Sequence, residues 1–166
     1  MPSILLLLDR RYLNIFILDT DVAKCAEYHC DKHVVKMILE SAQMLSTVCR
    51  KSGLNIGYKP THSHHPCTLW ASDSLSNWIW LRHLTAYLNE EYKYRYNKTC
   101  NHKSYDLANT LPLPNISDVG LTPFAQAMPD KYKQVNAVKA YRNYYKHEKA
   151  GLLQWTNRSV PHWVAA

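Results

Sequence analysis

The feature that most restricts the fold is a helical repeat of apolar residues between Val22 and about Arg50. Asp19-Thr20-Asp21 precedes this segment and offers side-chain acceptors for a helix N-terminus. We expect one break in the helix near Cys30. Residues recurring at intervals of three and four lie on one face of an α-helix, and here they are Val34, Ile38, Ala42 and Leu45.

Two later segments also carry a helical pattern. Thr68 to about Tyr96 is the second predicted helix, and Pro66 stands at its first turn, where proline is favoured. Asp130 to about Lys149 is the third. Only four glycines are present, which disfavours a turn-rich β fold. The sequence therefore predicts an all-α, single compact domain of about three main helices with long ordered loops. Its further core candidates are Leu69, Leu75, Trp78, Leu81, Leu84, Val135, Val138 and Tyr145.

Residues 1–13 fit no element of such a domain, and we treat them as an N-terminal extension of doubtful status. Their apolar run, Ile4 to Leu8, is too short to span a membrane. Arg10 and Arg11 follow the run rather than precede it, so it is a poor signal peptide. The five cysteines include no CxxC pair, which favours free thiols in a reducing compartment. We expect a cytoplasmic protein.

The charge balance points to nucleic acid. The net charge is +7, and twelve tyrosines and five tryptophans accompany it. Cations meet phosphates and aromatic rings stack on bases. Two segments, Tyr92–His102 and Tyr141–Lys149, pair both kinds of side chain. The alternatives are a basic protein without a polyanionic partner, and tyrosines half in the core. The candidate DNA contacts are Arg95, Lys98, Tyr141, Arg142, Tyr144, Tyr145, Trp155 and Arg158.

The segment Asp31–Leu45 holds the strongest group of candidate catalytic side chains. His33, Lys36, Glu40 and Gln43 stand at i, i+3, i+7 and i+10, which places an imidazole, an amine and a carboxylate on one helix face. Glu40 can act as a general acid or base, and Lys36 as an amine nucleophile. The alternative is a solvated helix face with an ordinary Lys/Glu pair.

The loop Thr61–Cys67 is dense in histidine. His62, His64 and His65 can contact phosphate or polarise a leaving group. A zinc site that combines this loop with Cys25, His29, Cys30 and His33 is an alternative. Structural zinc sites usually show two tight ligand pairs, so we expect no metal and no cofactor.

From Asn14 to Val164 the chain resembles a widespread family of small bacteriophage proteins. The matching stretches are NIFILD, CDKHVVKMILESAQML, PFAQAMPD and AYRNYYKHEK. Asp31-x-His33 followed by Glu40 is also similar to the helix that carries the catalytic Glu of the phage pyrimidine-dimer DNA glycosylases (endonuclease V). The aromatic-basic run from Tyr141 and the His65-Pro66-x-x-x-Trp70 element match as well. The resemblance implies a phage-encoded protein whose residues 14–166 form one glycosylase-like domain.

The resemblance also implies a metal-free monomer that flips a base from duplex DNA. An amine attacks C1′ of the deoxyribose, and a Glu, here Glu40, assists imine formation and β-elimination. The family enzyme has arginines beside its Glu where this chain has Leu39 and Gln43. We therefore expect phosphate contacts near Glu40 from Lys36, Arg50 or Lys51, and further contacts from His62 and His65.

The nucleophile in the family is the N-terminal α-amine. A start codon at Leu13, followed by methionine removal, would expose the α-amine of Asn14. An α-amine loses its proton more readily than a lysine does. Asn14 and Lys36 are thus the two candidate amines.

The sequence predicts a DNA-repair glycosylase, with an AP-lyase step as an option, acting on damaged or modified pyrimidines. The alternatives are a non-catalytic nucleic-acid-binding protein and an enzyme that modifies free nucleotides or bases.

Overall fold

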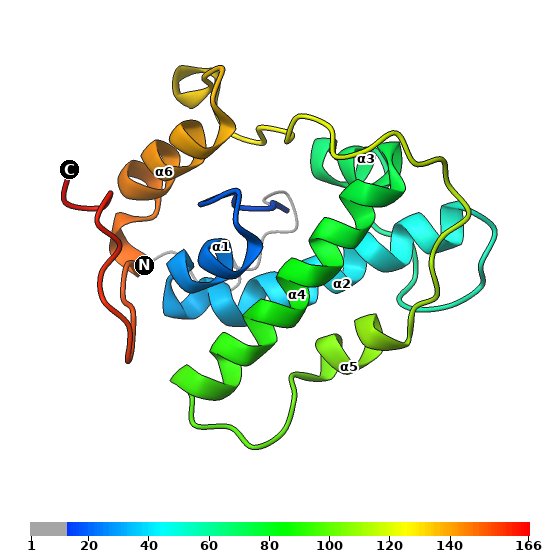
Figure 1. The fold of residues 1–166 in the computed structure, drawn as a ribbon, viewed down its shortest axis with the longest axis horizontal. Coiled ribbons are helices and arrows are strands. Elements are labelled where there is room, and N and C mark those ends of the chain that lie inside the picture. Colours follow the sequence, from blue (N-terminus) through cyan, green and yellow to red (C-terminus); the bar gives the residue numbers. More distant parts are fainter. Residues whose placement is uncertain (1–12) are drawn as a thin grey trace, which may run out of the picture.

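The computed structural model describes residues 13–166, which contain helices and no β-strand. The all-α prediction is confirmed for this part of the chain, but the count of about three main helices was too low. Residues 13–166 contain six α-helices and two short 3-10 turns (Figure 1). They are α1 (Val22–Tyr28), α2 (Asp31–Lys51), α3 (Pro66–Asp73), α4 (Leu75–Arg95), α5 (Lys103–Thr110), η3 (Asp130–Tyr132), α6 (Ala137–Glu148) and η4 (Ala150–Leu152).

The break predicted near Cys30 is confirmed, because α1 ends at Tyr28 and α2 begins at Asp31. The second predicted helix is two helices. Ser74 between them has an extended backbone, and its hydroxyl donates to Asp118, which also accepts from the amide and hydroxyl of Ser76. This loop carboxylate therefore serves as the N-terminal cap of α4.

The third predicted helix is shorter than its pattern. Only η3 and α6 are helical within it, and the intervening chain ends at Asn136, whose side chain caps α6. Val135 in this connection is fully exposed, and Leu69 on α3 is also exposed, so both predictions of core residues were wrong. Helix α5 was not predicted. It is short and begins at Lys103, directly after His102, whose ring caps the helix by accepting from the amide of Ser104.

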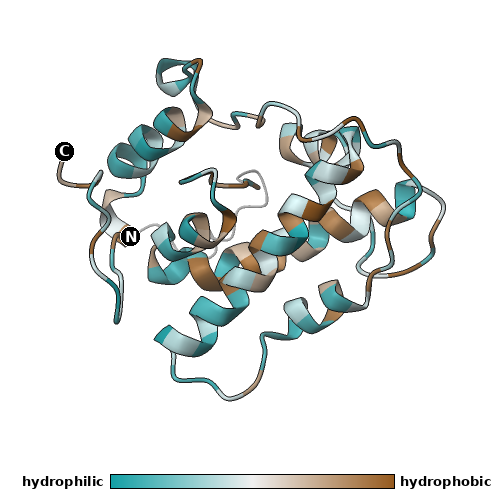
Figure 2. Cartoon of the chain, viewed as in Figure 1, coloured by the Kyte–Doolittle hydropathy of each residue, from teal (hydrophilic) through white to brown (hydrophobic). Residues whose placement is uncertain are grey.

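The core forms where α2 and α4 cross at the centre of the molecule (Figure 1). Trp78 of α4 is fully buried, and its indole donates to the carbonyl of Leu45 at 3.2 Å. The segment of residues 13–18 is buried, and its Phe16 ring packs on His33 of α2 and Tyr145 of α6. In Figure 2 apolar residues recur along α2 and α4, while much of α6 is hydrophilic.

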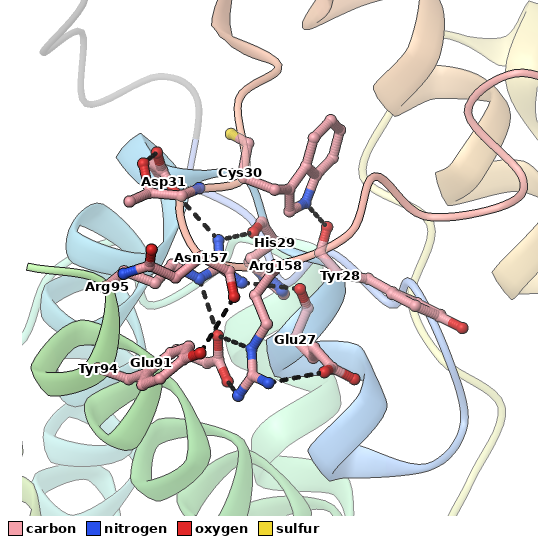
Figure 3. A network of polar contacts seen from close by, with 12 residues as sticks. Glu27, Tyr28, His29, Cys30, Asp31, Glu91, Tyr94, Arg95, Asn157 and Arg158 are labelled. Atoms are coloured by element: carbon pink, nitrogen blue, oxygen red, sulfur yellow. Dashed lines mark hydrogen bonds and ion pairs between the residues drawn. The ribbon is translucent and has the colours of Figure 1, made fainter.

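A buried network of ion pairs and hydrogen bonds links the end of α4 to the end of α1 and the start of α2 (Figure 3). Arg95 at the end of α4 is bound to Glu91 at 2.8 Å and to Asp31 at 3.2 Å. Its guanidinium also donates to the carbonyls of Glu27 and His29. These carbonyls lie at the C-terminus of α1, where the helix leaves acceptors unpaired.

Four of the five cysteines are buried, and all five are free thiols. In the part of the chain that the structure describes, no helix combines the length and apolar character needed to cross a membrane. The predicted N-terminal extension, up to residue 12, lies outside the described residues.

Candidate active site

Two clefts meet at Leu13, and the second of them opens along one side of α2. They measure about 690 and 700 Å³, and Leu13 lines both. The first lies between the extended N-terminal segment, the end of α6 and the loop before η3. The second lies between α2 and the histidine-dense loop. Polar residues in the first cleft are Asn14, His65, Gln126, Lys133, Tyr144, Glu148 and Lys149. Those in the second are Lys36, Glu40, Gln43, Tyr58, Lys59, Thr61 and His62.

Glu40 is the buried carboxyl group of this site. Only 8% of the residue is exposed, and its Oε2 has no hydrogen-bond partner among the described residues. Burial raises the pKa of Glu40 from its ordinary value of 4.5 to about 7, against the opposing charges of Lys36 and Lys149. A buried carboxylate disfavours its charged form because the surroundings solvate it poorly. Glu40 can therefore take up or release a proton near neutral pH.

His33 stands two turns before Glu40 on α2 and is also buried. Its ring stacks on Phe16 at 4.6 Å, and its Nδ1 lies 3.0 Å from the Tyr145 hydroxyl. Burial holds the pKa of His33 well below its ordinary value, and the positive charges of His29, Lys149 and Lys36 lower it further. The imidazole is thus neutral at physiological pH. Because His33 and Glu40 are both buried, the alternative of a wholly solvated helix face does not describe this segment.

Asp31, the first residue of the Asp-x-His motif, has a structural position. Its carboxylate accepts from the amide and hydroxyl of Thr156 at 2.9 and 2.6 Å, and from Arg95. It lies in the first turn of α2, where a negative charge is favourable. Asp31 therefore ties the C-terminal segment to the start of the helix that carries Glu40.

Lys149 is a functional candidate that the analysis of the sequence did not single out. It follows the last residue of α6, and its ammonium lies over the rings of Tyr144 and Phe16, at 5.4 and 5.8 Å. Burial lowers the pKa of Lys149, and the charge of Lys36 lowers it further. Its only signal in the sequence is its place at the end of the AYRNYYKHEK stretch.

Asn14, the candidate terminal amine, lies at the edge of the first cleft with its side chain turned into the protein. The side-chain oxygen accepts from the amide of Ile15 and from the Tyr141 hydroxyl, and the side-chain nitrogen donates to the carbonyl of Ala127. These bonds fix the chain where it enters the cleft. The role of the Asn14 α-amine stays a prediction.

Glu40 is a buried carboxyl group in a cleft that Lys36 and Lys59 also line, and this arrangement is suited to acid–base chemistry on a bound substrate. A sequence model of the family described as "Pyrimidine dimer DNA glycosylase" matches residues 13–104. The match spans more than half of the chain and includes Glu40. The chain belongs to this family. No curated protein and no solved structure matches.

The family match ends within α5. Lys149 and all of α6 lie beyond it, although α6 forms one wall of the first cleft. About three quarters of the way along the chain, the loop of Gln126–Pro129 completes the same wall. The family match thus covers Glu40 and the whole second cleft, and the C-terminal third of the chain supplies most of the lining of the first cleft.

The histidine-dense loop borders both clefts. His62 lines the second, and His65 lines the first, where its ring also accepts from the amide of Cys67 at the start of α3. Between residues 13 and 166 no group of three or more His, Cys, Asp or Glu side chains is placed to hold a metal ion. Phosphate contact by His62 and His65 stays a prediction.

The structure separates the candidate DNA contacts into free and engaged side chains. Lys51 and Lys98 are exposed and can reach a polyanion, and Lys51 also donates to the carbonyl of Ser63. Arg50 instead holds the loop that follows α2, because it donates to the carbonyls of Gly57 and Tyr58. Arg142 pairs with Asp19 at 3.0 Å.

Several other candidates are built into the protein interior. Tyr141 and Tyr145 are completely buried, and Arg95 is buried in its ion pairs. The indole of Trp155 donates to the carbonyl of Tyr28, and the half-exposed Arg158 pairs with Glu91. Because enclosed rings cannot stack on a base and both arginines are held by Glu91, we leave these five out of the interface proposed below. Tyr144 lines the first cleft and stays a candidate.

The raised pKa of Glu40 predicts a stability effect. The folded protein holds the Glu40 proton more tightly than the unfolded chain does, so this group lowers the free energy of unfolding as the pH rises from about 4.5 to about 7. Glu40→Gln removes this penalty. We expect the variant to exceed the wild type by on the order of 1–3 kcal/mol above pH 7 in urea titrations, with the gain shrinking toward pH 4.5. A stability difference that is constant with pH would contradict the burial of an ionisable Glu40.

Proposed function

We propose that the protein is a DNA glycosylase that acts on pyrimidine dimers or related damaged pyrimidines in duplex DNA, as a monomer. One observation carries the proposal: in a chain of the pyrimidine dimer DNA glycosylase family, the carboxyl group of Glu40 lines a cleft, is almost fully buried and has an unpaired oxygen among the described residues. Buried ionisable groups with perturbed pKa values are concentrated in catalytic sites.

The chemistry that fits is excision of a flipped base. An amine forms a bond to C1′ while the bond from C1′ to the base nitrogen breaks, and the departing base takes the electron pair and a proton. Glu40, with a pKa near 7, can supply or accept the protons that move. In an AP-lyase step, the resulting imine loses a proton from C2′ and the 3′ phosphate leaves.

Positive charge surrounds the clefts. Lys36 and Lys59 line the second, and Lys133 and Lys149 line the first. Four ammonium groups in this arrangement can meet the phosphates on both sides of a flipped nucleotide. The net charge of +7 adds a general attraction to DNA.

This charge predicts a steep salt dependence of DNA binding. If about four phosphates are contacted, the affinity should fall roughly a hundredfold or more between 50 and 200 mM salt, because each contact releases condensed counterions. Fluorescence anisotropy with a labelled duplex measures this. Lys59→Met should reduce the slope of log affinity against log salt concentration by about the amount expected for one phosphate contact. An affinity that does not change with salt would contradict a duplex DNA substrate.

Nicking of supercoiled plasmid tests the activity itself. We expect the protein, followed by alkali treatment, to convert ultraviolet-irradiated plasmid to the open-circle form and to leave unirradiated plasmid intact. Plasmids with abasic or alkylated sites, treated in parallel, define the lesion class. Tight binding without nicking of any damaged plasmid would identify a non-catalytic DNA-binding protein and overturn the proposal.

A further inference from the structure

We infer that Tyr58 is the stacking surface of the second cleft, on which a base turned out of the duplex at the damaged step packs its ring. The inference rests on the damaged-DNA substrate of the proposed function, and it assigns a base-binding residue to that site. Its basis is the way in which the loop after α2 is fastened, the position of the Tyr58 ring and the side chains that share the cleft with it.

The loop that carries Tyr58 is held against α2 by contacts to its backbone. The guanidinium of Arg50 donates to the carbonyls of Tyr58 and Gly57, each at 2.7 Å. Gly57 has a φ of +78°, which favours glycine, and it lies too close to α2 for a side chain. Further along the loop, the amide of Thr61 donates to the Thr47 hydroxyl at 3.1 Å. The protein itself therefore fixes this wall of the second cleft.

Tyr58 is fixed at both of its ends. Arg50 binds its carbonyl, and its hydroxyl lies 3.0 Å from the hydroxyl of Ser104 on α5. The ring is half-buried, and it packs against the hydrophobic core while it also lines the cleft. Within residues 13–166 no other aromatic ring stacks on it. A fixed aromatic ring that borders an open cleft is the kind of surface on which bases stack.

The other side chains of the second cleft suit a nucleobase. Leu39, which is exposed on α2, and Pro60 supply apolar contacts. Gln43 lies one turn beyond Glu40, and within the described residues its side-chain amide makes no hydrogen bond. This amide has both donors and an acceptor, as the edge of a base does. Enzymes hold flipped bases by this combination of stacking and contacts to the polar edge.

Affinities for three duplexes of one sequence test the inference. The first carries a thymine dimer, the second an abasic site in place of the lesion, and the third the dimer with an abasic site opposite it. Tyr58→Leu should lower the affinity for the first duplex by about tenfold or more, the usual effect of losing one base–ring stack. On the duplex that lacks the stacking base, the wild type and the variant should bind alike, and this duplex identifies the strand that supplies the base.

Two further variants separate the ring from the fold. Tyr58→Phe keeps the ring and loses only the hydroxyl contact with Ser104, so it should bind the dimer duplex nearly as tightly as the wild type. Tyr87→Leu removes an exposed ring of α4 that lines neither cleft, and it should change nothing. Equal losses of affinity for all three duplexes in Tyr58→Leu would show a structural role and overturn the inference.

Photocrosslinking of the wild-type protein requires no variant to fold. 5-Iodouracil replaces the base that the duplexes identify, and the irradiated complex is digested and mapped by mass spectrometry. We expect the crosslink on Tyr58, and a crosslink confined to other residues would overturn the inference. A base-dependent effect of Tyr58 without nicking of any damaged plasmid would support the base site and end the glycosylase proposal. Nicking without that effect would do the reverse.

Discussion

Replacement of Glu40 by glutamine is expected to lower the rate of base excision by about 10²–10⁴-fold, the usual contribution of a positioned acid or base. The amide has nearly the same shape as the carboxyl group but cannot exchange a proton near pH 7. The free Oε2 and the cleft around it should otherwise be unchanged. Affinity for damaged duplex should therefore stay within a few fold of the wild type.

Single-turnover excision and equilibrium binding, measured on the same duplex, separate these two effects. Glu90→Gln is the matched control, because Glu90 is an exposed carboxylate on α4 that pairs with Lys93, and it should leave both values unchanged. A Glu40→Gln protein that excises at the wild-type rate would show that Glu40 serves the structure alone.

Replacement of Arg95 by methionine is expected to lower the free energy of unfolding by about 3–5 kcal/mol, the usual cost of breaking a buried ion pair from one side. The guanidinium side chain is fully enclosed. Its loss leaves Asp31 with fewer partners and removes the donors that serve the carbonyls of Glu27 and His29. Glu91 keeps Arg158 as a partner, which limits the damage.

Urea denaturation of the wild type and two variants measures this effect. Lys93→Met, which removes a partly exposed i,i+3 pair on the same helix, should cost no more than about 0.5 kcal/mol. A loss of less than 1 kcal/mol for Arg95→Met would show that the network in Figure 3 contributes little to folding. The DNA affinity of the same variants is a useful second measurement. The sequence predicts that Arg95 contacts DNA, whereas the structure buries its side chain.

The helical pattern of α2 could be read from the sequence because its apolar face repeats over many turns. Glu40 was found in the same way, from its spacing to His33 and Lys36 on one face. The burial of that face could not be predicted, since it depends on the extended segment of residues 13–18, where Phe16 stacks on His33. Tertiary contact, and not the helix pattern, makes this carboxyl group unusual.

The boundaries of the other helices depend on distant partners. Ser74 ends α3 and starts α4 because Asp118, from a loop far along the chain, caps the second helix. No local sequence pattern predicts this helix boundary. Val135 was placed on a helix by its spacing, yet it stands fully exposed in the turn between η3 and α6.

The aromatic and basic residues illustrate the limit of composition as a guide to an interface. Tyr145 and Arg95 have the residue types that favour DNA contact, but each supplies polar groups that the interior needs. The Tyr145 hydroxyl accepts from the amide of Cys30 at the start of α2, and Arg95 serves the end of α1. Lys149, in contrast, drew no attention in the sequence because an isolated lysine near a helix end is ordinary until its surroundings are known.

The most direct test of the central claim is excision from a duplex that carries one thymine dimer at a defined position, measured under single turnover with an end label. We predict that the wild-type protein cleaves a glycosidic bond of the dimer, so that alkali treatment then gives a single cut at the lesion. The undamaged duplex of the same sequence should stay whole. The Glu40→Gln protein should leave both duplexes intact. An uncut dimer duplex at saturating protein, bound but unchanged, would contradict the assignment of this cleft as a glycosylase active site.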